Sequence, residues 1–156
     1  MTTHKKTRLE ELVSKLKAIK AKDIMSPHVI TTQENATLSE VAGIMVKERI
    51  SGIPVLSKKG AMVGIITMSD LFIVMDMIES GDVLEDGAGI FNPTVKFGMS
   101  TDTVKVKQNT TIHEIIGLVK YKNVHTVPVF EGKNLVGIIG RRDIFNTFYE
   151  TVRSVQ

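Results

Sequence analysis

The sequence predicts a mixed α/β (α+β) fold in which two βαββα repeats follow an amphipathic helix. Three observations lead to this prediction. The chain of 156 residues matches itself over two long segments. Both segments contain the same signal for the start of a helix. Both also contain two short β-branched runs, separated by a polar turn and followed by a helical stripe of apolar residues.

The amino-terminal segment, residues 1–21, is predicted to be a basic arm that continues into a helix. Apolar residues recur there at helical spacing: Leu9, Leu12, Val13, Leu16 and Ile19. We expect this helix to pack on the body of the protein or on a second subunit. Residues 1–22 carry a net charge of +5, whereas the whole chain carries +3, so the remainder is net negative. The basic arm suits an acidic contact, but the body lacks the positive field expected of a nucleic-acid binder.

The repeat is the main organising feature of the chain. Met25–Leu56 matches Met99–Phe130 at an offset of 74 residues, and Val63–Phe72 matches Val136–Phe145 at an offset of 73. The segment between the two copies contains glycines and acidic residues without periodicity, and we expect it to be a mobile linker. The predicted boundaries are 22–79 for the first repeat, 80–94 for the linker, 95–150 for the second repeat and 151–156 for a carboxyl-terminal tail.

Each repeat is predicted to run strand, helix, strand, strand, helix. Thr37 with Glu40, and Thr111 with Glu114, form the capping box that begins a helix. The stripes that follow are Leu38, Val41, Ala42 and Met45 in one copy and Ile112, Ile115, Ile116 and Val119 in the other. The paired strands are expected at 53–56 with 62–66 and at 127–130 with 135–139. The last helices present Leu71, Phe72, Met75 and Ile78, or Ile144, Phe145, Phe148, Tyr149 and Val152, as faces to bury.

The composition excludes several classes of protein. The chain has no cysteine, which excludes zinc fingers, thiolate clusters, cysteine nucleophiles and disulfides and suits the cytoplasm. No apolar run reaches the roughly 18 residues of a membrane span, and no secretory signal is recognisable at the start. The four histidines lack metal-ligand spacing, so we expect no metal site. No Walker loop, nucleophile elbow or HExxH motif suggests an enzyme.

The clearest chemistry lies where a strand turns into a helix at Thr67 and Asp70. Free backbone N–H groups at a helix start attract anions, and a carboxylate there can accept hydrogen bonds from the two vicinal hydroxyls of a ribose. Thr-x-x-Asp also fits a capping box, so Asp70 could simply cap its helix. In the second copy Gly140 replaces the hydroxyl while Asp143 remains, a pattern that capping alone explains poorly. Both interpretations stay open.

The repeat, which ends in Gly-Ile-Ile-Thr-x-x-Asp after an upstream hydrophobic-Pro-Val, resembles the cystathionine β-synthase (CBS) domain, here as a tandem pair in a stand-alone protein. The resemblance implies two units packed through their sheets about a pseudo-twofold axis, with two clefts between them. It also implies binding of adenosine-containing ligands, dimerisation into a flat disc and regulation of a partner.

Carried over by position, the resemblance implies two unequal clefts. Cleft 1 would comprise Thr67 and Asp70, with Thr103 and Val104 from the first strand of the other copy along the adenine, and His125 and Arg142 near the phosphates. Cleft 2, which we expect to be weaker, would comprise Asp143, Val29, Ile30, Ser51 and Ser69. Alternatively, His125 is only the polar end of a strand and Arg142 a solvated charge.

These observations predict a non-catalytic, energy-sensing regulatory module that binds AMP, ADP or ATP, with S-adenosylmethionine or NAD as further candidates and no required cofactor. The alternative is a dimeric scaffold with empty or incidentally occupied clefts. We expect a homodimer in the cytoplasm, with no membrane and no nucleic acid as a partner. The sequence names neither the regulated protein nor the direction of the response.

Overall fold

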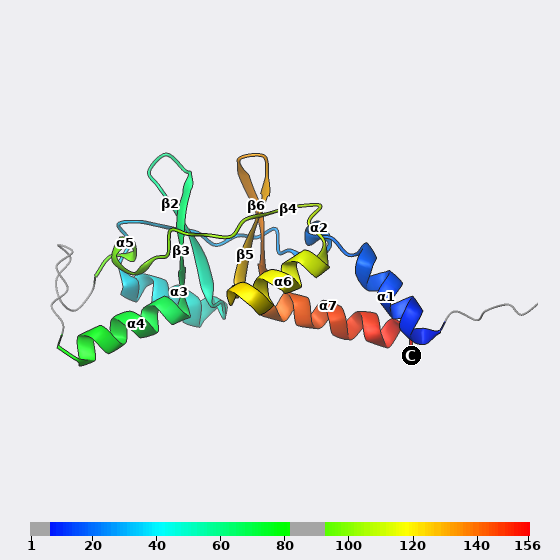
Figure 1. Ribbon diagram of the computed structural model, residues 1–156. Helices are drawn as coiled ribbons and strands as arrows, with labels where there is room; N and C mark the ends of the chain where they lie inside the picture. Colours follow the sequence, from blue (N-terminus) through cyan, green and yellow to red (C-terminus); the bar gives the residue numbers. More distant parts are fainter. Residues whose placement is uncertain (1–6, 82–92) are drawn as a thin grey trace, which may run out of the picture. The chain divides into compact units, whose positions relative to one another are not determined.

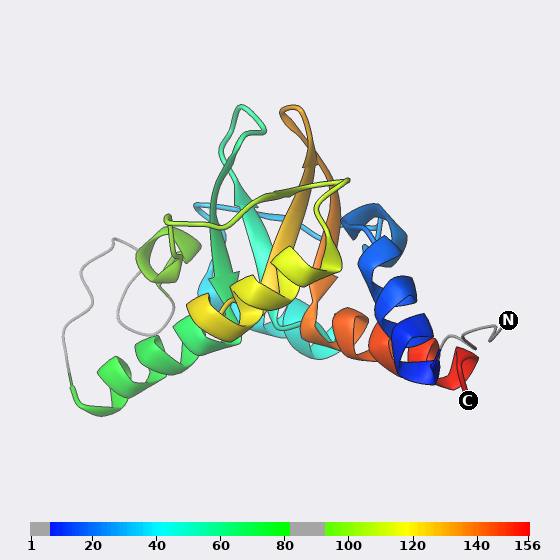
Figure 2. The same ribbon diagram turned by 45° about the vertical axis from the view of Figure 1, so that its right-hand side comes forward.

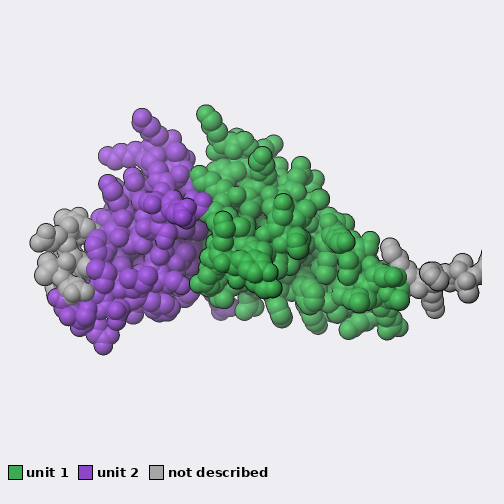
Figure 3. Space-filling model, viewed as in Figure 1, with its two compact units in different colours: residues 1–29, 104–156 green, residues 30–103 purple. Residues whose placement is uncertain are grey.

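The computed structural model describes residues 7–81 and 93–156. The chain divides into two compact units (Figure 3): unit 1 consists of residues 1–29 and 104–156, and unit 2 of residues 30–103. Each unit has a three-stranded sheet with helices packed on it, as the sequence predicts. Residues 82–92 of the predicted mobile linker lie outside the described residues.

Unit 2 contains the helix and strands of the first repeat (Figure 1). Its elements are β1 (Thr32–Gln33), α3 (Leu38–Glu48), β2 (Gly52–Leu56), β3 (Met62–Thr67), α4 (Met68–Glu79) and α5 (Val95–Gly98). The sheet order is β1-β2-β3, with β1 parallel to β2 and β3 antiparallel to it. Pro54 is the register partner of Ile65, so the two strands predicted for the first repeat pair with each other.

Unit 1 repeats this arrangement and adds the amino-terminal helices. Its elements are α1 (Arg8–Ala18), α2 (Ala21–Ile24), β4 (Val106–Lys107), α6 (Ile112–Lys122), β5 (Thr126–Glu131), β6 (Asn134–Gly140) and α7 (Arg141–Ser154). The sheet order is β4-β5-β6, with the same parallel and antiparallel pairs. Helix α1 meets the carboxyl-terminal end of α7 (Figure 2), where Lys15 Nζ donates to Ser154 Oγ at 2.9 Å. The predicted amphipathic helix therefore packs on the body of its own unit.

The predicted helix starts are confirmed. Glu40 N–H donates to Thr37 Oγ1 at 3.3 Å and the Glu40 carboxylate accepts from Thr37 N–H at 3.0 Å, with matching bonds between Thr111 and Glu114. Each box satisfies two of the N–H groups that a helix start leaves unpaired. Both helices also end alike, because Arg49 and Asn123 adopt the left-handed conformation with φ of 56° and 53°.

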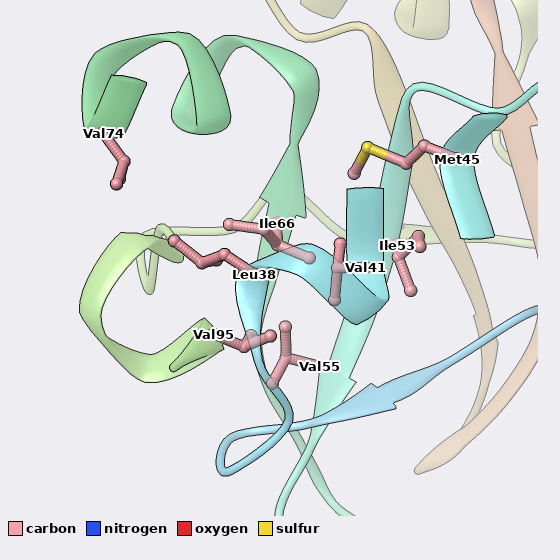
Figure 4. Packing of buried hydrophobic residues seen from close by; sticks show 8 residues of the cluster. All are labelled: Leu38, Val41, Met45, Ile53, Val55, Ile66, Val74 and Val95. Carbon is pink, nitrogen blue, oxygen red and sulfur yellow. The ribbon is translucent and has the colours of Figure 1, made fainter. Parts of the chain in front are cut away.

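The core of unit 2 gathers around α3 and the strand pair (Figure 4). The buried side chains are Leu38, Val41 and Met45 of α3, Ile53 and Val55 of β2, Ile66 of β3, Val74 of α4 and Val95 of α5. The predicted stripe of α3 thus faces the core. The matching stripe of α6 is only partly buried, because Ile112 and Ile115 are covered while Ile116 is 40% exposed.

The last helix of each repeat departs from the sequence prediction. Leu71 and Val74 of α4 turn towards the core, and Ile144 does so in α7. Phe72, Met75, Phe145, Phe148 and Tyr149, predicted as parts of buried faces, are exposed. The reason is geometric: the sheet side of each helix is already filled by a narrower stripe, so the wider apolar arc extends beyond it.

The segment that begins each repeat packs on the sheet of the other repeat. Ser26 pairs with Ile138 of β6 in unit 1, and Ser100 pairs with Ile65 of β3 in unit 2. A glycine allows each close approach: a Cβ at Gly64 would lie 2.8 Å from the Ser100 carbonyl oxygen, and one at Gly137 would meet the Met25 side chain. Residues 22–29 and 95–103 therefore complete units other than those of their own repeats.

In the described part of the chain, no helix has the length and apolar character needed to cross a membrane.

Candidate functional site

The start of α4 holds the first two predicted site residues together. Thr67 ends β3 and caps α4, and Asp70 lies in the first turn of that helix. Asp70 Oδ2 accepts from Thr67 N–H at 2.8 Å and from Thr67 Oγ1 at 2.9 Å, while Asp70 N–H donates to Thr67 Oγ1 at 3.3 Å. Asp70 therefore does cap its helix, and the cap uses one carboxylate oxygen.

The second oxygen of Asp70 points to a residue that the sequence analysis did not single out. Ser100 Oγ donates to Asp70 Oδ1 at 3.3 Å. The backbone of Ser100 is held by hydrogen bonds in both directions with Ile65, at 2.9 Å each, which brings the hydroxyl to the helix start. The shared Met-Ser pair at 25–26 and 99–100 was the available signal, because it opens both copies of the repeat.

The start of α7 keeps the carboxylate without the hydroxyl. Asp143 Oδ2 accepts from Gly140 N–H at 2.7 Å, which is half of a capping box. The interpretation that capping explains Asp143 poorly is therefore wrong, because a backbone N–H is the only partner this bond requires. Ser26, the counterpart of Ser100, instead lies with its Oγ 3.5 Å from the carbonyl oxygen of His28.

His125 lies beside the start of α7. Its neighbour Thr126 pairs with Gly140, and its ring Nε2 lies 2.9 Å from Asn123 Oδ1. Partial burial lowers the pKa of His125 below its ordinary value, and the nearby positive charge of Arg141 lowers it further. Arg142, the predicted phosphate contact, is exposed on the first turn of α7. Sequence reasoning missed Arg141 as a charge that acts on His125.

Two predicted phosphate positions of cleft 2 lie at the start of α4. Met68 N–H donates to the Ser51 carbonyl oxygen at 2.9 Å, and Ser69 is the second residue of the helix. Both serines are exposed. Ser51 and Ser69 therefore lie with the Thr67–Asp70 cap at one helix end of unit 2. Because the N–H groups of Met68 and Asp70 are already bonded there, the helix dipole is the feature that favours an anion.

The four residues predicted to contact the adenine were expected in the first strand of each repeat but lie outside the strands. Val29, Ile30, Thr103 and Val104 lie in irregular chain just before β1 and β4, not within the first strands. The parallel pairing with β2 or β5 covers only two residues in each repeat, so the extended chain ahead of it is not part of a sheet.

The predicted sites draw on both units. Thr67, Asp70 and Thr103 of cleft 1 belong to unit 2, whereas Val104, His125 and Arg142 belong to unit 1. Cleft 2 is divided likewise, with Val29 and Asp143 in unit 1 and Ile30, Ser51 and Ser69 in unit 2. The structure thus joins Thr67 with Asp70 at the start of α4 and places His125 beside the start of α7. Assembly of the predicted sites from the residues of the two units remains a prediction.

A separate groove of about 520 Å³ lies between α1, α2 and α7 within unit 1. Its walls include Lys15, Asp23, Thr147 and Glu150, and no predicted site residue lines it. Across residues 7–81 and 93–156, no three His, Asp or Glu side chains gather as a metal site would need.

Comparisons with known proteins place this geometry in a family. The model of the CBS domain matches residues 21–76 and 95–150. The inosine-5′-monophosphate dehydrogenase of Methanocaldococcus jannaschii is 30% identical over 143 residues, which cover 90% of this chain but only 26% of that protein. The chain thus spans about a quarter of the length of this relative, which carries an enzyme's name.

Solved structures show the same fold. The CBS domain pair of protein MJ0100, in complex with 5′-methylthioadenosine and S-adenosyl-L-methionine, superposes with a TM-score of 0.72 at 24% identity and covers 85% of this chain and 97% of its own. CBSX2 in complex with AMP gives a TM-score of 0.71 at 17% identity, covering 85% and 98%. Because the family model matches both repeats, over most of the chain, the protein belongs to the CBS domain family, as a tandem pair of CBS domains.

Proposed function

We propose that this protein is a non-catalytic regulatory module that binds an adenosine-containing ligand, with AMP, ADP or ATP preferred, between its two CBS repeats. Ligand binding changes the arrangement of the repeats, and a partner protein responds to that change. The names of two similar structures support the ligand class, since one contains AMP and the other S-adenosylmethionine with methylthioadenosine. S-adenosylmethionine and NAD remain the less preferred ligands.

The observation that supports the proposal most directly is the hydrogen bonding of the Asp70 carboxylate. One carboxylate oxygen is fixed by two bonds from Thr67, whereas the other accepts only the long 3.3 Å bond from Ser100 among the described side-chain bonds. A carboxylate oxygen has room for two donors, so Oδ1 retains capacity for a ribose hydroxyl. The capping bonds hold the carboxylate in place before the ligand arrives, which reduces the entropy lost on binding.

The rest of cleft 1 supplies complementary contacts in this proposal. Thr103 and Val104 lie along the adenine, while Arg142 and protonated His125 attract the phosphates. Cleft 2, with Asp143, Val29, Ile30, Ser51 and Ser69, offers hydroxyls in place of these cations and binds more weakly. The hydrogen bonds at the start of α4 support the first assignment, and the missing hydroxyl at Gly140 supports the second.

The module acts as a homodimer in this proposal, and its regulated partner is a separate protein. A second candidate function is a dimeric scaffold whose clefts do not respond to ligand. The exposed apolar faces of α4 and α7 favour dimerisation under either function, so only ligand binding separates the two.

Isothermal titration calorimetry with AMP, ATP, S-adenosylmethionine and NAD tests the function. We expect saturable binding of an adenine nucleotide to the wild type and loss of the tighter event in Asp70→Asn. This variant keeps an acceptor for Thr67 N–H, so the helix cap survives while the ribose loses a charged acceptor. Glu114→Gln is the matched control, because it alters an equivalent cap outside the proposed clefts. Absence of binding by all four ligands would favour the scaffold.

A further inference from the structure

Helix α7 turns a polar side towards α1 and α2 inside unit 1 (Figure 2), and a groove of about 520 Å³ lies between the three helices. Asn146, Thr147, Glu150 and Thr151 line it from α7, at the i, i+3 and i+4 spacing of a single helix face. Much of the apolar side of the same helix is exposed instead. A helix usually turns its apolar side inwards, and departures from such a rule are expected at functional places.

The two threonine hydroxyls of this wall can act only as acceptors. Thr147 Oγ1 donates to the carbonyl oxygen of Asp143 at 2.8 Å, and Thr151 Oγ1 donates to that of Thr147 at 2.7 Å. A hydroxyl has one proton, so both protons are in use while the oxygens keep lone pairs. A molecule in the groove can therefore bond these oxygens only as a donor.

The lysine that lines the groove has its donors engaged. Lys15 Nζ donates to Ser154 Oγ at 2.9 Å and to the carbonyl oxygen of Ser154 at 3.4 Å, and it forms an ion pair with Glu11 at 3.3 Å. An ammonium group has three N–H donors, so these contacts use all of them, and the Glu11 carboxylate balances its charge. Lys15 therefore offers little to an anion in the groove.

Two carboxylates of the groove keep an oxygen for a ligand. Asp23 Oδ2 accepts from Lys20 N–H at 2.8 Å, and Glu150 Oε1 forms an ion pair with Arg153 at 3.7 Å. Within residues 7–81 and 93–156, the other oxygen of each carboxylate has no hydrogen-bond or ion-pair partner. Two half-buried isoleucines of α1–α2 also line the groove, Ile19 and Ile24. The groove thus combines unused acceptors with apolar surface.

We propose that this groove binds a linear polyamine, a molecule in which short methylene chains join two or more ammonium groups. An ammonium group donates hydrogen bonds and accepts none, so it complements walls that only accept. In this proposal the ammonium groups lie against the carboxylates of Asp23 and Glu150 and donate to the two threonine hydroxyls, while the methylene chains contact the isoleucines. The site is separate from nucleotide binding, because no residue predicted for either cleft lines the groove.

Two features favour a polyamine over a single ammonium group, such as the lysine side chain of a partner protein. The carboxylates come from different helices, Asp23 from α2 and Glu150 from α7, so two positive groups match them better than one. A volume of about 520 Å³ also lies within the range of small-molecule pockets and exceeds what one ammonium group fills.

The charges of the two units make this proposal easy to separate from general charge attraction. Unit 1 contains 15 Lys and Arg against seven Asp and Glu, whereas unit 2 contains five against ten. A polyamine held by net charge alone should therefore prefer unit 2. Binding in unit 1 requires the acceptors of the groove.

NMR spectroscopy of the full chain, labelled with nitrogen-15, locates the site. Putrescine and spermidine are titrated at low salt, and the neutral diol of the same chain length as putrescine is the control. We expect saturable shifts of the backbone amides of Ile24, Thr147 and Thr151 with both polyamines, stronger with spermidine, and none with the diol. Shifts confined to unit 2, or no saturable shifts, would overturn the proposal.

Variants of the groove test the acceptors themselves. Thr147→Val combined with Thr151→Val removes two acceptors and leaves the charge and nearly the shape unchanged. We expect the dissociation constant of spermidine to rise roughly tenfold or more, since hydrogen bonds to a charged group are lost. Glu150→Gln should also weaken binding, whereas Glu79→Gln on α4 is the matched control outside the groove and should not. Circular dichroism checks that each variant is folded. Unchanged binding in a folded valine variant, or an equal loss in Glu79→Gln, would contradict the assignment.

A lysine analogue separates the two cationic occupants. Nα-acetyl-lysine methylamide carries one ammonium group on a four-carbon stem, as an exposed lysine of a partner protein does. We expect it to bind more weakly than spermidine in the same titration. Binding as tight as that of spermidine would show that the groove accepts a protein lysine and would overturn the polyamine.

Discussion

The starts of α4 and α7 occupy equivalent places in the two repeats but use different partners. Both carboxylates, Asp70 and Asp143, accept a backbone N–H from the residue that precedes their helix. Only Asp70 also receives hydroxyls, from Thr67 and Ser100. The difference teaches that both copies keep the hydrogen bond to the backbone at the helix start, whereas the hydroxyl groups around the carboxylate differ between the copies.

The largest expected effect separates the two carboxylates by ligand affinity. Asp70→Ala should weaken AMP binding by about 3 kcal/mol, or roughly a hundredfold, because hydrogen bonds to a charged group are worth about 1.5–3 kcal/mol each. Asp143→Ala should leave this tighter event almost unchanged. Titration calorimetry of both variants at low and moderate salt measures the contrast. Loss of the tighter event in Asp143→Ala alone would invert our assignment of the clefts.

A second comparison concerns Gly64 and Gly137, which lie against residues 99–100 and Met25, respectively. Gly64→Ala should destabilise the protein by roughly 1–3 kcal/mol, because the new methyl would press on the backbone carbonyl of Ser100. Gly137→Ala should cost less, since it meets the flexible side chain of Met25. Urea unfolding curves give both values. Equal losses would mean that Met25 cannot move aside.

We expect a pH dependence of stability from the residues beside the start of α7. The cause is His125. Its pKa in the folded protein is lower than the ordinary histidine pKa of 6.5, so folding makes protonation of the ring less favourable. In the free protein the unfolded chain then binds the proton more readily, so stability is present above about pH 6.5 and decreases as the pH falls through this region.

Nucleotide binding should show the opposite trend. Protonated His125 attracts phosphate, so the wild type should gain affinity for AMP over His125→Gln as the pH falls below 6.5. Comparing the two proteins at each pH cancels the titration of the phosphate itself. Parallel affinity curves for the two proteins would remove His125 from the phosphate contacts.

The smallest expected effect comes from replacing Gly140, the N-cap of α7, by threonine, the residue that caps α4. Gly140 has a φ of −100°, which any residue adopts, and a Cβ there would lie 3.6 Å from Asp143 Oδ2. Gly140→Thr should therefore stabilise the protein by a few tenths of a kcal/mol, the usual gain of a hydroxyl cap over glycine. Thermal unfolding measures this gain. If AMP binding at the weaker cleft also strengthens, the hydroxyl contributes to the ligand as well as to the helix.

The sequence predicted those parts of the fold that depend on neighbouring residues. Thr37 and Thr111 begin their helices as expected, and the β-branched runs around Pro54 and Pro128 form the paired strands. The periodicity of α4 and α7 did not distinguish side chains that face the core from those that are exposed, because both kinds are apolar. Phe72 and Phe145 were therefore expected to be buried within the chain and are exposed.

The candidate site was less predictable, because it depends on contacts between distant parts of the chain. Asp70 and Asp143 were recognisable from their motif, but the bond from Ser100 to Asp70 joins residues 30 positions apart. It exists only because Ser100 pairs with Ile65, a bridge that no local pattern encodes. The strand placement of Val29 and Thr103 failed similarly, since the length of a parallel pair is set by the partner strand.

Residues 22–29 and 95–103 each pack in the unit that contains the strands of the other repeat, and this limits how the protein can be divided into fragments. If residues 1–81 and 93–156 were produced as separate polypeptides, each would carry a piece that the other needs: the first holds Met25 and Ser26 for β6, and the second holds Met99 and Ser100 for β3. Each fragment alone would leave one sheet without its covering segment. The two halves are thus expected to behave as a split protein, poorly folded apart and restored by mixing.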